Sequence, residues 1–223
     1  MNIKVKFAAV FLLSFLVAGC GKNSKPTPFD GNPTKGLDGM PERAAFCAPD
    51  ATGAYSENVT VQTGEGGDQY VWGQGGGCVH RSIRETWAVA HNQPLMVWSK
   101  VSSSDYKIRN DLPDGVSFFY EVDYVVHSLE TVDWTMDWYH AVTTGTVKDP
   151  HNIVINYKKV SGTRYIREWE GSIWIDEVDP NVTAVRIRNQ VNASQQGLPE
   201  VEITVREVLE KFRTGAPNYG PLN

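Results

Sequence analysis

The sequence has no apolar run long enough to cross a membrane as a helix. The most apolar run, residues 7–17, is roughly half of the about 20 residues that a span needs. Cysteine is scarce as well, with three residues in 223, and there is no CxxC pair. The five histidines are scattered, and no HExxH motif occurs. These absences remove the usual sequence signatures of zinc sites, so we expect no metal and no cofactor.

Basic residues are too few and too dispersed for a nucleic-acid-binding protein. Lys and Arg total 21 against 26 Asp and Glu, which gives a net charge of −5, and no run of basic residues occurs. We therefore expect no nucleic-acid partner. The glycine-rich stretch at 73–78, GQGGGC, lacks the Lys-Ser/Thr of a phosphate loop and has no GxGxxG spacing. We interpret it as permissive backbone at a corner of the chain.

The N-terminus has the three parts of a secretory signal. Lys4 and Lys6 supply positive charge, residues 7–17 are apolar apart from one serine, and small residues follow. A signal of this kind is removed from the mature protein. We therefore assign residues 1–19 to a signal peptide.

The end of this signal, Val17-Ala18-Gly19-Cys20, resembles the bacterial lipobox. The resemblance implies that Cys20 becomes the first mature residue and carries lipid. Because residue 21 is Gly and not Asp, it further implies the outer membrane, with the protein facing the periplasm. Several acyl chains hold a protein far more firmly than one. The alternative is an ordinary secretory signal with an incidental cysteine.

With Cys20 assigned to lipid, Cys47 and Cys78 are left as a pair. An exported protein folds in an oxidising compartment, so we predict a Cys47–Cys78 disulfide. Two buried thiols are the alternative.

The chain divides into a tether, one domain and a short tail. Residues 20–45 are rich in proline and glycine and poor in apolar residues, which predicts a flexible, lipid-anchored tether. Residues 46–215 form the domain, and 216–223 a tail. With 41 % hydrophobic and 11 % aromatic residues, the chain can bury a substantial core.

Within the domain, strands dominate the middle. Residues 118–126 and 132–138 alternate between apolar and polar, which predicts two half-buried strands joined by a short turn. Three more strand candidates follow at 152–160, 163–178 and 182–191. Strands at hairpin spacing predict an antiparallel sheet.

Two helices are expected on either side of these strands. Ser82 and Glu85 have the spacing of a capping box, which predicts a short amphipathic helix. Near the C-terminus, apolar residues recur at helical spacing over 201–212, with Pro199 before them and Gly215 after. This longer helix has one strongly apolar face that must lie on the sheet.

The order of elements and several local stretches resemble the START-like or SRPBCC superfamily, the helix-grip fold. The stretches are GDQYVW at 67–72, SIRETW at 82–87, IVINY at 153–157, GTRYI at 162–166 and GSIW at 171–174. The resemblance implies an α+β fold. In it, a curved antiparallel sheet wraps around a long C-terminal helix, and short helices follow the first strand. A β-sandwich with a terminal helix is the alternative.

In that superfamily, a pocket between sheet and helix binds lipids and other apolar ligands. Such pockets are common small-molecule sites. We therefore expect a periplasmic lipoprotein that binds an apolar small molecule or lipid. The residues predicted to line the pocket are Tyr120, Tyr124, Trp134, Trp138, His140, Val205 and Leu209. A core in which these side chains leave no space is the alternative.

Two other functions remain open. The chain could be a scaffolding or assembly lipoprotein that acts through protein contacts, in which case an exposed apolar patch should exist. It could also be a cyclase- or hydrolase-like enzyme that uses His140 with a nearby Asp or Tyr. A histidine among aromatic residues is more often hydrogen-bonded in a core, so we expect no catalytic residue.

Overall fold

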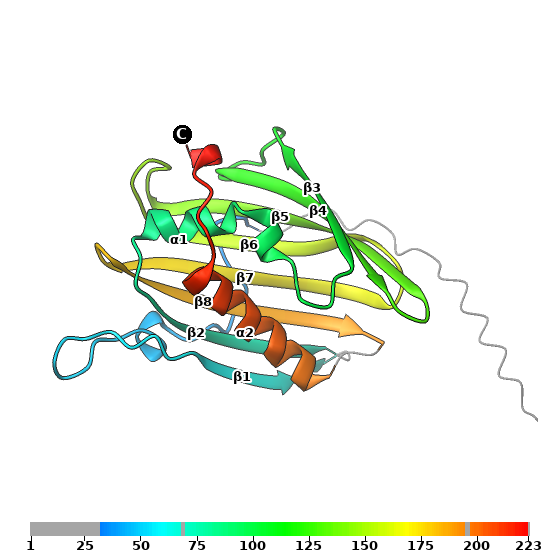
Figure 1. Cartoon of the computed structure of the whole chain (residues 1–223), viewed down its shortest axis with the longest axis horizontal. Coiled ribbons are helices and arrows are strands. Elements are labelled where there is room, and N and C mark those ends of the chain that lie inside the picture. Colours follow the sequence, from blue (N-terminus) through cyan, green and yellow to red (C-terminus); the bar gives the residue numbers. More distant parts are fainter. Residues whose placement is uncertain (1–31, 68–69, 195–196, 223) are drawn as a thin grey trace, which may run out of the picture.

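The computed structural model describes residues 32–67, 70–194 and 197–222, so the predicted signal peptide and Cys20 lie outside the described residues. No helix in these ranges is both long and apolar enough to cross a bilayer. The elements follow in this order (Figure 1): η1 (Arg43–Ala45), β1 (Thr60–Glu65), β2 (Val71–Val79), α1 (Ile83–Ala90), η3 (Gln93–Met96), β3 (Ser103–Arg109), β4 (Phe118–His127), β5 (Thr131–Gly145), β6 (Pro150–Gly162), β7 (Ile166–Asp179), β8 (Val182–Ala193), α2 (Leu198–Thr214) and η4 (Gly220–Leu222).

All eight strands form one antiparallel sheet with the order β1-β2-β8-β7-β6-β5-β4-β3. Strands β3 to β8 pair with their neighbours in sequence, whereas β2 pairs with β8. This pairing brings the N-terminal hairpin beside the last strand and leaves β1 and β3 as the edges. The curved, open sheet with a C-terminal helix confirms the predicted α+β, helix-grip architecture.

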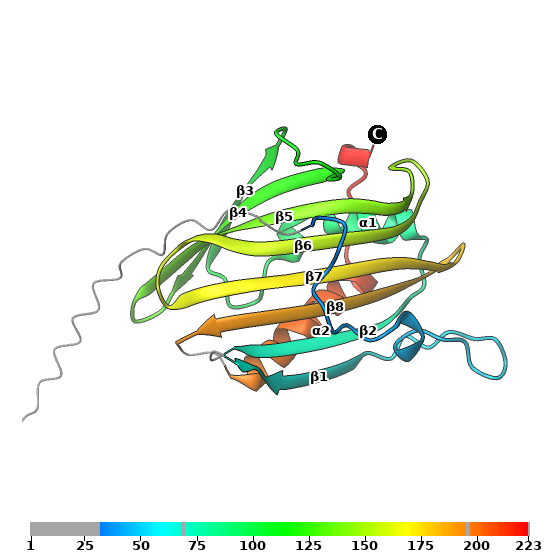
Figure 2. The same ribbon diagram turned by 180° about the vertical axis from the view of Figure 1, so that it is seen from behind.

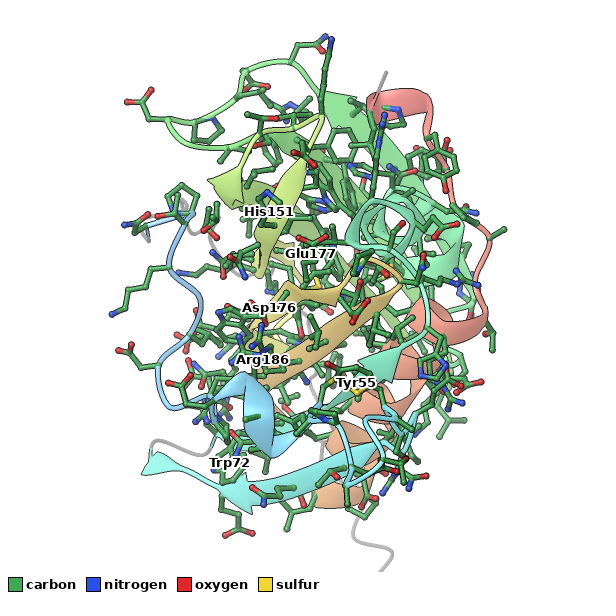
Figure 3. All side chains as sticks on the ribbon, turned by 90° about the vertical axis from the view of Figure 1, so that its left-hand side faces the viewer. Tyr55, Trp72, His151, Asp176, Glu177 and Arg186 are labelled. Atoms are coloured by element: carbon green, nitrogen blue, oxygen red, sulfur yellow. A yellow bond between two sulfur atoms is a disulfide. The ribbon has the colours of Figure 1, made fainter. Side chains whose placement is uncertain are left out.

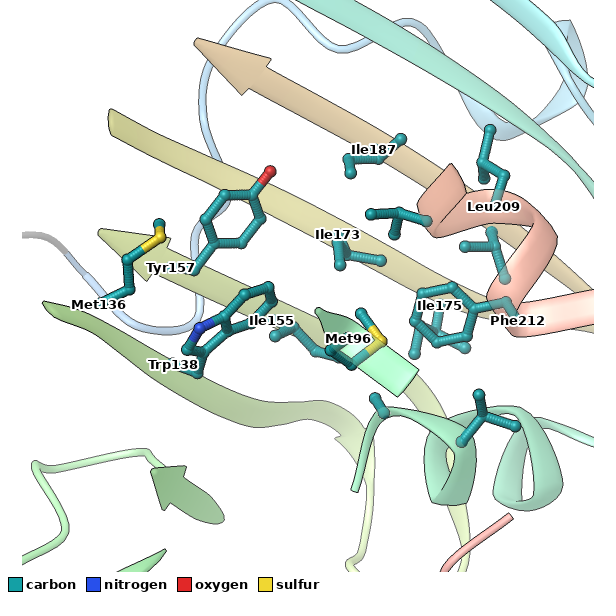
Figure 4. Packing of buried hydrophobic residues seen from close by; sticks show 14 of the residues in the cluster. Met96, Met136, Trp138, Ile155, Tyr157, Ile173, Ile175, Ile187, Leu209 and Phe212 are labelled. Atoms are coloured by element: carbon teal, nitrogen blue, oxygen red, sulfur yellow. The ribbon is translucent and has the colours of Figure 1, made fainter. Parts of the chain in front are cut away.

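Both longer helices begin where the sequence predicts. The capping box of α1 is formed by Ser82 and Glu85. Helix α2 has a proline in its first turn and is capped at its C-terminus by Gly215. α2 lies across β1, β2 and β8, and α1 lies over β6 and β7, on the same face of the sheet (Figure 1). The core between them is filled by branched and aromatic side chains from both layers (Figure 4).

The glycine-rich stretch 73–78 lies inside β2, so the expected corner is wrong. A Cβ atom at Gly73 would lie 2.5 Å from Val201, and one at Gly75 would lie 2.9 Å from Val205. Both valines belong to α2. The glycines therefore serve close packing of helix on strand, which sequence composition alone does not distinguish from a turn.

Residues 32–46 cross the convex face of the sheet, opposite the helices (Figure 2). The Leu37 amide donates to Ser172 Oγ at 2.9 Å, and Asn156 Nδ2 donates to the Pro33 carbonyl at 3.0 Å. Arg186 Nη1 donates to the Pro41 carbonyl at 2.9 Å. The described part of the predicted tether is therefore bound to the domain. The segment has few apolar residues to bury, so hydrogen bonds to polar side chains on the convex face attach it instead.

The Arg186 side chain that binds this segment is itself held by an ion pair with Asp176 on β7, at 2.7 Å, and both side chains are largely buried (Figure 3). The Cys47–Cys78 disulfide is present and joins the end of the segment to β2.

The last residues also pack on the domain. The Asn218 amide donates to the Ala88 carbonyl at 2.8 Å, and Leu222 is buried in the main core. The predicted tail at 216–223 is therefore, over its described residues, a strap across α1.

Candidate functional site

Cross-strand pairs of aromatic rings line the concave face of the sheet. Tyr120 lies opposite Trp138 in the register of β4 and β5, and Tyr124 lies opposite Trp134. The ring centroids are 5.7 Å apart in the first pair and 5.2 Å in the second, and both pairs are stacked. Alternation along each strand places these rings on one face. They form a continuous aromatic wall along the β4–β5 half of the sheet.

A cavity of about 310 Å³ opens at one end of this wall, between the hairpin turns of the sheet and α2. Its volume is at the lower end of the range of small-molecule pockets. The sheet and its turns contribute Val126, Ser128, Val132, Trp134, Tyr165, Ile166, Trp169 and Ala193 to the lining. The loop after η3 contributes Trp98, Ser99, Lys100 and Val101, and α2 contributes Glu200, Ile203, Thr204 and Glu207.

Trp98 closes the cavity on its inner side. Its ring lies 4.5 Å from that of Trp169, 5.1 Å from that of Tyr124 and 6.0 Å from that of Trp138. The loop that carries Trp98 is fixed to α2, because Ser99 donates to Glu207 through both its amide, at 3.1 Å, and its hydroxyl. The Lys211 ammonium also donates to the Val97 carbonyl. Helix α2 therefore positions the loop that forms one wall.

Asn189 positions Trp169, which lines the cavity from β7. Its Oδ1 atom accepts hydrogen bonds from Trp169 Nε1 at 2.6 Å and from the Tyr157 hydroxyl at 2.9 Å. Asn189 is completely buried on β8. In contrast, the indole N–H groups of Trp98 and Trp134 have no acceptor among the described residues. The protein thus holds one of the three cavity tryptophans by a hydrogen bond and the other two by ring packing.

A second polar cluster lies deeper, beneath α1. Trp87 Nε1 donates to His140 Nδ1 at 3.0 Å, so the neutral His140 ring carries its proton on Nε2. The His91 ring lies 5.2 Å from that of His140 and 4.4 Å from that of Phe118. Burial lowers the pKa of His91 to about 4 and that of His140 well below its usual value. Both rings are therefore neutral at neutral pH.

This cluster offers no catalytic arrangement within the described residues. No carboxylate is hydrogen-bonded to His140, and His140 is not part of the cavity lining. The same residues contain no group of three or more His, Cys, Asp or Glu side chains that could hold a metal ion. We therefore place the site at the cavity rather than at His140.

The structure separates the seven predicted lining residues. Only Trp134 lines the cavity. Tyr124 and Trp138 belong to the aromatic wall and contact the ring of Trp98, and Tyr120 is fully buried further along the same wall. His140 lies beneath α1. Val205 and Leu209 are buried in the core, where Val205 packs α2 against Gly75.

Sequence reasoning missed two of the three cavity tryptophans. Trp169 has the same parity on β7 as Ile173 and Ile175, which are buried in the core, and this pattern could have identified it. Trp98 lies in a loop with no periodicity, so no local signal marks it.

No family model matches the sequence, and no curated protein matches it. Several solved structures match, and two of them are described here. The STAR-related lipid transfer protein of Xanthomonas axonopodis superposes with a TM-score of 0.50 at 14 % identity, over 75 % of this chain and 96 % of that one. Human STARD10 gives a TM-score of 0.50 at 11 % identity, over 72 % of this chain and 70 % of that one. These likenesses confirm a START-like, helix-grip fold.

Proposed function

We propose that this START-like domain binds an apolar small molecule or lipid in the cavity between α2 and the hairpin end of the sheet. The observation that carries the proposal is the lining: three tryptophans and several aliphatic residues surround a space of about 310 Å³. Burial of apolar ligand surface there contributes roughly 25 cal/mol per Å². The similar fold of a protein described as a STAR-related lipid transfer protein supports it.

The volume restricts the ligand. A cavity at the lower end of the usual range holds a small molecule or part of one acyl chain, and not the whole of a two-chain lipid. Lys100, Glu200 and Glu207 lie in the lining as well, so the charged groups are available to the polar end of an amphiphile.

We further propose that Cys20 anchors the chain to the periplasmic face of the bacterial outer membrane. The lipobox-like stretch 17–20 supports this location, and an apolar ligand then lies close to a membrane from which it can enter.

Native mass spectrometry of protein purified from membranes tests ligand binding. We expect a bound apolar compound that is lost in Ala193→Phe, because the larger side chain fills the cavity from the end of β8. Ala44→Phe adds the same ring at an exposed position in η1 and should retain the compound. If the wild-type chain neither retains nor takes up any apolar compound, the proposal is wrong.

One observation favours the alternative of a scaffolding lipoprotein that acts through protein contacts. Tyr106 and Ile108, on the edge strand β3, and Leu112, in the loop that follows, are each nearly half exposed. An exposed apolar edge strand is suited to pairing with another chain. Crosslinking in cells distinguishes the two functions, because a stable protein partner lost in Ile108→Lys would support the scaffold.

A further inference from the structure

Strand β3 is an open edge of the sheet (Figure 1). It is the last strand in the sheet order, so its side away from β4 has no strand partner in the described ranges. Six of its seven residues are exposed, whereas only three of the six residues of the other edge strand, β1, are exposed. Exposed apolar side chains also occur elsewhere, at Leu129 and Ile203 for example. What distinguishes β3 is an accessible row of backbone N–H and C=O groups that can pair with another strand.

The two faces of β3 differ in character. Tyr106 and Ile108 share the concave face with buried side chains of β4, but they are 46 % and 49 % exposed. Asp105, Lys107 and Arg109 alternate with them and lie on the convex face. The strand therefore offers apolar contacts on one face and charges of both signs on the other.

Asp105 has no opposite charge to pair with among the described residues of its own chain. It lies opposite Asp123 of β4, and like charges in a cross-strand pair are destabilising. In contrast, Lys107 forms an ion pair with Glu121 at 3.6 Å. The Lys107 side chain is still 71 % exposed, so its ammonium can bind a second carboxylate. The edge strand thus presents an unpaired carboxylate and an accessible ammonium two residues apart.

A second copy of β3 fits this charge pattern. In a two-fold symmetric pair of antiparallel strands, residue i of one copy faces residue j of the other, and j faces i. With the axis at Tyr106, Asp105 of each copy faces Lys107 of the other, and Ser103 faces Arg109. An axis at Asp105 or at Lys107 instead places that charge opposite its own copy. A lysine on an edge strand normally keeps other chains away, but here the aspartate two residues before it compensates the charge.

We propose that two copies of this chain form a dimer by antiparallel pairing of their β3 strands about a two-fold axis at Tyr106. The pairing supplies backbone hydrogen bonds to the open edge, joins Asp105 to Lys107 twice and brings the two Tyr106 rings together on the concave face. The seven residues of β3 span about 24 Å, so the contact is of modest size. Because the axis is perpendicular to the sheet, both cavities lie on one face of the joined sheet and both N-terminal segments lie on the other.

Cysteine crosslinking in the cells that produce the full chain tests this register. In the proposed dimer, Tyr106→Cys lies directly opposite its own copy, with about 5 Å between the Cα atoms. Ile108→Cys faces Ser104 and lies about 14 Å from its copy, since the two positions are four residues apart along the strands. A short bismaleimide should therefore link Tyr106→Cys into a dimer and leave Ile108→Cys monomeric. Adding Ser104→Cys to Ile108→Cys should produce the crosslink.

Charge reversal tests what holds the two strands together. In the Tyr106→Cys background, Asp105→Lys places lysines opposite each other and Lys107→Asp places carboxylates opposite each other, so each should remove most of the crosslinked dimer. The double reversal restores opposite charges and should restore the crosslink. Glu168→Lys makes the same charge change at an exposed position of β7 and should have no effect. Circular dichroism of each purified variant establishes that it is folded.

Four outcomes would overturn the proposed dimer. They are the absence of a crosslink in Tyr106→Cys, equal crosslinking of Tyr106→Cys and Ile108→Cys, a folded double reversal that does not regain the crosslink, and a crosslinked product that mass spectrometry identifies as a complex with a different protein. The last outcome would favour the scaffolding alternative, in which β3 pairs with another chain.

Discussion

Asn189 shows how one polar side chain orders an apolar interior. It lies on the same face of β8 as Ile187 and Val191, where its amide oxygen accepts from Trp169 and Tyr157. A buried acceptor shared by two donors removes the penalty of burying either donor alone. Asn189 therefore fixes a cavity wall without touching the cavity itself.

We predict that Asn189→Leu lowers the free energy of unfolding by about 2–4 kcal/mol, because two buried donors lose their acceptor. Urea unfolding followed by circular dichroism measures the change. Gln190→Leu is the control, since Gln190 is the next residue on the strand and its amide donates to Glu170 on the opposite face of the sheet. Its effect should stay below about 1 kcal/mol. Equal losses in the two variants would contradict the role of Asn189.

The neutral histidines beneath α1 predict the response to acid. Folding lowers the pKa of His91 from 6.5 to about 4 because burial disfavours the charged ring. Below pH 6.5 the unfolded chain therefore binds a proton that the folded chain does not, so the free energy of unfolding decreases as the pH falls towards 4. The shift corresponds to about 3 kcal/mol, and His140 acts in the same direction. His91→Phe should make this dependence shallower in urea titrations at a series of pH values. An unchanged slope would contradict the prediction.

At the scale of elements, the contact of α2 with β2 decides the shape of the domain. The helix carries its apolar face at the spacing that the sequence predicts, but the close approach depends on glycines in the facing strand. The same helix holds the Trp98 loop through Glu207 and Lys211. One helix thus closes the core on one side and forms the cavity on the other.

We expect Gly75→Ala to destabilise the domain by about 1–3 kcal/mol through overpacking. The added Cβ atom would lie 2.6 Å from the Thr60 carbonyl oxygen, which belongs to the backbone of β1, and 2.9 Å from Val205, which is fully buried. Gly67→Ala is the matched control, because no atom lies within 4 Å of a Cβ there. Thermal unfolding of both variants measures the difference, and the same melting temperature for both would show that α2 does not depend on Gly75.

For the whole molecule, covalent and polar links join the N-terminal segment to the domain. The Cys47–Cys78 disulfide closes a loop of 31 residues, and hydrogen bonds to Ser172, Asn156 and Arg186 continue the attachment back to Pro33. If the chain is anchored to a membrane upstream, the link to the domain therefore ends at Pro33 on the sheet. This attachment limits how the cavity can be oriented relative to that membrane.

We predict that the double variant Cys47→Ser and Cys78→Ser loses about 3–4 kcal/mol of stability, because the unfolded chain regains the entropy of that loop. In this double variant, amide hydrogen exchange should be faster in residues 32–46 than in the β-sheet, because only polar contacts then attach the segment. Guanidinium unfolding measures the global change. Stability equal to that of the wild-type chain would mean that the disulfide has no effect on the folded domain.

Local sequence patterns determined much of the fold. Alternation gave the faces of β4 and β5, the capping box located α1, and the helical spacing at 201–212 located α2, because each signal depends only on neighbours along the chain. The pairing of Cys47 with Cys78 followed from their number and the expected compartment.

Only the tertiary structure decided where space remains. Trp98 in a loop, Trp169 on β7 and Ile203 on α2 meet at one cavity although they are far apart in sequence. His140 does not line this cavity and instead accepts a hydrogen bond from Trp87 beneath α1. Composition also could not show that residues 32–45 adhere to the convex face, because that depends on polar groups from three distant strands. Burial and packing are set by all elements together, whereas periodicity reports one element at a time.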